Sequence, residues 1–126
     1  MARRIGTTPS RAVGAGRGRT GAGGGVRVIL TTVPAAAAAA LATSLVKARL
    51  AACVSEIPGV RSTYVWRARV ERARESLLII KTSRAKTSAL QASLAASHPY
   101  ETPEILVLDP AGIDKSYAAW VLASLD

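Results

Sequence analysis

Aromatic residues are scarce in this chain of 126 residues, which has no phenylalanine, two tryptophans and three tyrosines. Alanine is abundant instead, so the 49% of hydrophobic residues can bury less surface than this fraction normally implies. Small domains bury a smaller share of their surface than large ones, and small side chains add to this shortage. We therefore expect a marginal core in a single copy, which oligomerisation would relieve.

Cysteine and histidine each occur once, as Cys53 and His98. A lone cysteine cannot form an internal disulfide, which favours a reducing compartment, and we expect a cytoplasmic protein. A thiolate and an imidazole suit copper or zinc, but two ligands do not close a structural metal site. A nucleophilic Cys-His pair would also need an orienting third group, and the sequence has no such signature. We therefore expect no enzymatic activity.

Long apolar runs are missing as well, because no stretch reaches the 18 residues that suggest a membrane span, so we expect a soluble protein. Acidic residues are absent from residues 1–25, which hold five arginines and most of the glycines. That composition predicts a disordered Gly/Arg-rich extension, since it cannot bury enough surface to order itself. The alternative is a transit peptide, but its glycine content disfavours an amphipathic helix. Residues 26–126 are then the folded domain.

The folded domain alternates β-branched segments with helix-forming ones. The second expected strand is interrupted by Pro58-Gly59. Its second half and the third expected strand predict a long hairpin with its tip near Arg67 to Arg69. The order βαββαβα predicts an α+β fold, the ferredoxin-like split βαβ sandwich, with a four-stranded antiparallel sheet and helices on one face. The expected strands are 26–33, 52–57 resuming at 60–66, 70–81 and 104–108, and the expected helices are 35–49, 84–97 and 114–125.

Four segments, in register across the domain, carry a family resemblance. They read LVKARLAACVSEIPGVRSTYVW from Leu45, LLIIKTS from Leu77, HPYETPEIL from His98 and YAAWV from Tyr117. In this order and spacing the chain closely resembles the CutA family. The resemblance implies a ferredoxin-like protomer related in architecture to the PII signalling proteins, a tight homotrimer whose edge strands pair across subunits, and a part in tolerance to copper and other divalent metal ions.

The resemblance also directs attention to candidate site residues. Some family members have a cysteine at the position of Thr31 and a second histidine at that of Ser97, residues connected with copper binding, and only His98 of this set is present here. His98 and Cys53 are the candidate metal ligands, although Cys53 is more simply explained as a small buried strand residue. A second set has two explanations, the core and trimer interface or a ligand pocket between protomers, and comprises Tyr64, Trp66, Lys81, Tyr100, Glu101, Glu104 and Trp120.

The hairpin is rich in arginine, with five between Arg61 and Arg74. Phosphate neutralisation would allow nucleic-acid binding, but Glu71 and Glu75 interleave the arginines and no stacking aromatics accompany them, so nucleic acid is disfavoured as a partner. Two functions stay open. The first is a non-enzymatic homotrimer that responds to divalent metals and binds copper weakly. The alternative is a PII-like trimer that binds a small ligand in intersubunit clefts and signals to a partner.

Overall fold

The sheet and its helices follow one another as β1 (Val26–Val33), α1 (Ala35–Lys47), β2 (Cys53–Trp66), β3 (Arg69–Ser83), α2 (Thr87–Ser97), β4 (Leu106–Leu108) and α3 (Lys115–Ser124). These elements come from a computed structural model, which describes residues 21–126. The predicted order βαββαβα is confirmed. None of the helices in the described part of the chain is long and apolar enough to cross a membrane.

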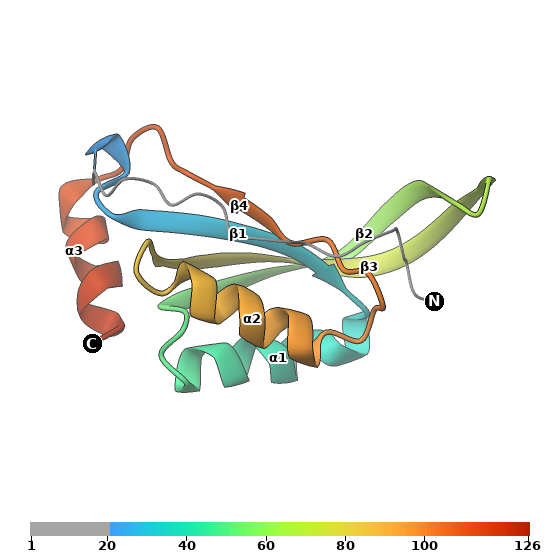
Figure 1. The fold of residues 1–126 in the computed structure, drawn as a ribbon, viewed down its shortest axis with the longest axis horizontal. Helices are drawn as coiled ribbons and strands as arrows, with labels where there is room; N and C mark the ends of the chain where they lie inside the picture. Colours follow the sequence, from blue (N-terminus) through green and yellow to red (C-terminus); the bar gives the residue numbers. More distant parts are fainter. Residues whose placement is uncertain (1–20) are drawn as a thin grey trace.

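The sheet has the strand order β2-β3-β1-β4, with antiparallel pairing throughout the described strands. The β1–α1–β2 and β3–α2–β4 halves of the chain thus interleave. The second strand of each half, β2 or β4, lies at an edge of the sheet, and the first strand, β1 or β3, lies inside it. This is the ferredoxin-like arrangement that the sequence predicted. Helices α1 and α2 both lie on one face of the sheet (Figure 1).

The main core fills the space between that face and the two helices. Alternate residues of the central strands point into it, among them Ile29 and Leu78, and neither is exposed. Leu41 and Leu45 of α1 are four residues apart and so meet the sheet from one side of the helix. Leu90 and Leu94 of α2 repeat that spacing, and together these rows of side chains exclude water from the helix-covered face.

The opposite face of the sheet carries no helix along most of its length, and we call it the helix-free face. By the register of the strands, it presents Val28, Leu30, Ile57, Leu77, Ile79, Leu106 and Leu108. Leu106 and Leu108 on the edge strand β4 are 49% and 45% exposed. A single copy therefore leaves one apolar sheet face only partly covered by its own described residues.

Helix α3 lies at the end of the sheet that is opposite the hairpin tip (Figure 1). Its residues Ala118, Val121 and Leu125 pack with Val26 in a second, smaller core. The helix is capped by Asp114, whose carboxylate accepts hydrogen bonds from the Tyr117 N–H and the Ser116 hydroxyl. These hydrogen bonds lower the pKa of Asp114 from its ordinary value, with the Ser116 hydroxyl contributing most.

We call the part of the sheet that α1 and α2 cover the body. Beyond the body, β2 and β3 continue as a hairpin that projects on its own (Figure 1). The register shifts between Ile57 and Val60, where Pro58-Gly59 was expected to interrupt the strand. The tip is a two-residue turn of Arg67 and Ala68, which both have positive φ angles of 54° and 65°. Both central residues of such a turn favour glycine or asparagine, so Ala68 occupies a position for which its Cβ is unsuited.

Some boundaries differ from the expected ones. Helix α2 begins at Thr87 rather than Arg84, because the chain first makes a turn in which the Lys86 N–H donates to Ser83. The paired part of β4 begins at Leu106 rather than Glu104. Gly21–Gly23, which the sequence assigned to the extension, forms a 3-10 helix that packs near Pro110. The rest of the predicted extension, residues 1–20, lies outside the described residues.

Candidate functional site

His98 caps the carboxyl end of α2, where its backbone N–H still donates to the Leu94 carbonyl and its own extended backbone conformation ends the helix. Its ring is buried against β1, and both ring nitrogens have partners. Nδ1 accepts the Tyr100 backbone N–H at 3.1 Å, so the ring proton of a neutral His98 belongs on Nε2. Nε2 then donates to the Thr32 carbonyl at 3.0 Å, and the Thr31 hydroxyl lies 3.1 Å from it. His98 therefore joins the end of α2 to β1.

Tyr100 extends this contact into a buried polar network. Its hydroxyl donates to Glu75 Oε1 at 2.7 Å, and its ring centroid lies 5.0 Å from that of His98. The Glu75 side chain is fully buried in the body of the molecule. In the sequence Glu75 only interleaves the hairpin arginines, as Glu71 does, and nothing in that pattern indicates that the Glu75 carboxylate is buried.

Cys53 lies elsewhere, at the start of the edge strand β2, where it pairs with Lys81 of β3. Its thiol is partly exposed and lies 3.9 Å from the Ser55 hydroxyl, which also accepts a hydrogen bond from Lys81 Nζ at 2.8 Å. Helix α3 approaches this place: burial raises the pKa of the Tyr117 phenol above its ordinary value, and the negative charge of a Cys53 thiolate adds to the shift. Cys53 thus belongs to the helix-free face near α3.

The two candidate metal ligands are not brought together within one protomer. In the ladder, Cys53 is level with Val28 of β1 and points to the helix-free face, whereas Thr31, which contacts His98, points to the other face. Strand spacing and rise put the Cα atoms of Cys53 and Thr31 roughly 14 Å apart. Among residues 21–126, no group of three histidine, cysteine, aspartate or glutamate side chains is placed to hold a metal ion.

The other predicted site residues are spread over the protomer. Tyr64 and Trp66 lie on the hairpin, opposite Glu71 and Arg69. Trp120 lies on α3, where its ring stacks on that of Tyr117 with a distance of 5.9 Å between the ring centroids. Its side chain is 51% exposed and so is not part of the core. The remaining two, Glu101 and Glu104, follow the end of α2 and precede β4. Within residues 21–126 this set is therefore not gathered in one place, and a pocket between copies stays a prediction.

The sequence comparisons agree with this fold. The family model of the CutA1 divalent ion tolerance protein matches residues 27–124. The chain belongs to the CutA1 family. A relative from Pectobacterium atrosepticum, named "Divalent-cation tolerance protein CutA", is 46% identical over 85 residues, which are 68% of this chain and 77% of the relative. A protein of the same name from Escherichia coli is 41% identical over 85 residues, which are 68% of this chain and 76% of that protein.

Solved CutA structures show the same architecture. The structure of CutA from Xylella fastidiosa has a TM-score of 0.78 and 35% identity, and the match covers 81% of this chain and 99% of that one. CutA1 from Oryza sativa has a TM-score of 0.76 and 38% identity, and the match covers 79% of this chain and 92% of that one. The resemblance to the CutA family that the sequence indicated is therefore confirmed. The family is named for divalent-cation tolerance rather than for a catalysed reaction.

Proposed function

We propose that this CutA protein takes part in the tolerance of divalent cations as a cytoplasmic, non-enzymatic homotrimer. The observation that carries the proposal is the apolar helix-free face, which one copy leaves partly exposed. Burying such a face against other copies stabilises the assembly, because apolar area removed from water contributes about 25 cal/mol per Å². The family resemblance implies that the number of copies is three.

The edge strand β2 supports self-association from a second direction. It runs from Cys53 to Trp66, and β3 pairs with only one of its sides. The N–H and C=O groups of a long edge can pair with another chain, and proteins cover such edges or interrupt them. The Pro58-Gly59 interruption disturbs this edge only in its middle. Pairing between copies would therefore protect β2 while the helix-free face is buried.

The metal chemistry proposed for this trimer is weak binding of copper. Within one protomer the donors do not fit a closed site, because Cys53 and His98 lie on different faces and both nitrogens of His98 have hydrogen-bond partners. A cation at Nδ1 would displace the Tyr100 N–H, and one at Nε2 would displace the bond to Thr32. Both exchanges oppose binding. Since no group of three candidate ligands is placed together within residues 21–126, a bound cation would take further ligands from other copies, and an imidazole with oxygen ligands prefers Cu(II) to Zn(II).

Calorimetric titration with Cu(II) and with Zn(II) tests the metal chemistry. The parent trimer should bind Cu(II) more tightly than Zn(II), and His98→Ala should lose most of this binding. Cys53→Ser serves as the matched variant, since it removes the other soft ligand without touching the His98 contacts. Circular dichroism and sedimentation of each variant without metal separate a lost ligand from a lost fold. Copper binding that is equal in the parent and in both variants would contradict the proposed ligands.

A further inference from the structure

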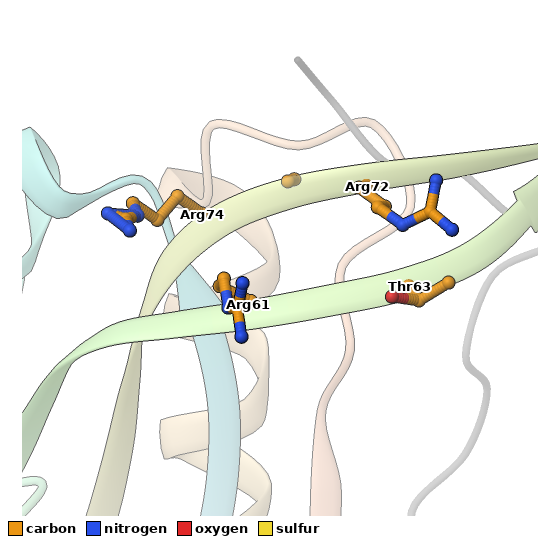
Figure 2. Close-up of a pocket in the computed structure, with 5 residues that line it drawn as sticks. Arg61, Thr63, Arg72 and Arg74 are labelled. Atoms are coloured by element: carbon orange, nitrogen blue, oxygen red, sulfur yellow. The ribbon is translucent and has the colours of Figure 1, made fainter.

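Three arginines gather on one face of the projecting hairpin. Arg61 comes from β2, and Arg72 and Arg74 come from β3 (Figure 2). Together with Thr63 they line a shallow hollow with a volume of about 450 Å³. We call this surface the arginine face. Its side chains are exposed, and within residues 21–126 none of the three guanidinium groups has a carboxylate partner.

The strand register explains why these charges are not neutralised. Arg61 lies directly opposite Arg74, and Thr63 lies opposite Arg72. Successive side chains of a strand point to opposite faces, so Glu71 and Glu75 lie across the sheet from the arginines that separate them in sequence. The expectation that these acids balance the arginines therefore does not hold on this face. Like charges that are directly opposite destabilise a sheet, so an anion bound between Arg61 and Arg74 would relieve a repulsion present without it.

The arginine face also remains accessible in the proposed trimer. Along β3, Arg72 and Arg74 alternate in step with Leu78 and Ile80, which point toward α1 and α2. The arginine face thus lies on the helix side of the sheet, beyond the ends of the helices. The trimer proposed above buries the other side. Assembly and anion binding therefore use different surfaces of the hairpin.

We propose that the arginine face binds an oligophosphate, either as a free anion or as the phosphate chain of a nucleotide. Guanidinium groups donate two parallel hydrogen bonds to phosphate oxygens, and they keep their charge at all physiological pH values. Three such groups around one hollow suit a compact ligand with several negative charges, and the Thr63 hydroxyl adds a neutral donor. Single-stranded nucleic acid would favour aromatic stacking beside the charges, but Tyr64 and Trp66 point to the opposite face.

Calorimetry with sodium tripolyphosphate, using the full chain at an ionic strength of about 0.15 M so that charges more than about 8 Å away are screened, tests this proposal. Arg61→Gln and Arg74→Gln should each weaken binding at least about tenfold, since each removes charge-assisted hydrogen bonds. Arg69→Gln is the matched control, because it removes the same charge from the same hairpin but on the other face, and its affinity should stay within about twofold of the parent. Thermal unfolding without the anion should show that Arg74→Gln is at least as stable as the parent, because the repulsion from Arg61 is gone.

The nature of the ligand follows from titrations with ATP and with single-stranded and duplex DNA. ATP that binds as tightly as tripolyphosphate identifies the phosphate chain as the recognised group, and ATP that binds more tightly identifies a nucleotide; both results support the proposal. Equal weakening by Arg69→Gln, or no binding of tripolyphosphate by the parent, would overturn it. DNA binding that exceeds tripolyphosphate binding and is lost in Arg61→Gln would overturn it in favour of a nucleic-acid surface. None of these outcomes depends on copper binding.

Discussion

The two halves of the β2–β3 ladder are built from the same strands but have opposite surroundings. In the body, Leu78 and Ile80 of β3 are fully buried beneath α1 and α2. In the hairpin, Val65 and Val70 face each other as a cross-strand pair and are 65% and 62% exposed. The body is thus stabilised by its own helices, whereas the hairpin depends on pairing between its two strands and on whatever else covers it.

This difference explains why a chain with few large apolar side chains extends a hairpin into solvent. A two-stranded ribbon without a covered face is marginally stable by itself. The stability of a single protomer does not account for the exposed strands, whereas the proposed contacts with other copies on one side and with an anion on the other would account for them. Under these proposals the body supplies the fold, and the hairpin supplies the surfaces for interaction.

The largest expected effect on the free energy of unfolding comes from comparing one apolar substitution in the body with one in the hairpin. Leu78→Ala in the body should lower the free energy of unfolding by about 2–5 kcal/mol, because it leaves a cavity in the main core. Val65→Ala in the hairpin should change it by less than about 0.5 kcal/mol, as expected for an exposed side chain. Chemical denaturation of the two variants measures both values. Equal losses would show that the hairpin has a core of its own.

A smaller effect on the free energy of unfolding is expected from the buried polar network around Tyr100. Tyr100→Phe removes the hydroxyl that donates to the buried Glu75 carboxylate, and it should lower the free energy of unfolding by about 1–3 kcal/mol. Thr63→Val removes a hydroxyl from the exposed hairpin and is the matched control, with an expected change near zero. Denaturation at neutral pH compares the two variants. A Tyr100→Phe variant as stable as the parent would mean that this hydrogen bond contributes nothing net.

The smallest effect is expected at the hairpin tip, where the change should be stabilising. Ala68 adopts a positive φ angle, which glycine adopts without steric cost, so Ala68→Gly should raise the free energy of unfolding by up to about 1 kcal/mol. Ala118→Gly in the middle of α3 is the control with the opposite sign, since glycine weakens a helix interior. A destabilised Ala68→Gly variant would indicate that the turn has another geometry in solution.

The sequence predicted the fold well because its signals were local and repeated. Alternating β-branched residues located β1 and the hairpin, and Pro58-Gly59 marked the irregularity in β2. The start of α2 was predicted three residues too early, since the side chain of Ser83 closes a turn before the helix begins at Thr87. Local patterns indicate that a helix exists more reliably than they indicate its first residue.

The arrangement around the candidate site was harder to predict, because it depends on contacts between residues far apart in sequence. Nothing near His98 indicates that both of its nitrogens are bonded to Thr32 and Tyr100. The buried state of Glu75 likewise results from Tyr100, which follows it by 25 residues. The arginine face was predictable in principle, since period-two alternation separates Arg74 from Glu75, but the mixed charges along the chain concealed it.

The central claim, that this CutA protein assembles through its helix-free face, is tested most directly by measuring its mass with sedimentation equilibrium. The parent should have three times the 13.1 kDa mass of one chain at micromolar concentration. Leu108→Glu places a charge on the helix-free face and should reduce the mass toward that of one chain, because burying an unpaired charge is costly. Val65→Glu places the same charge on the arginine face and should leave the trimer intact. A parent with the mass of a single chain, or a Leu108→Glu variant that remains a trimer, would contradict the account.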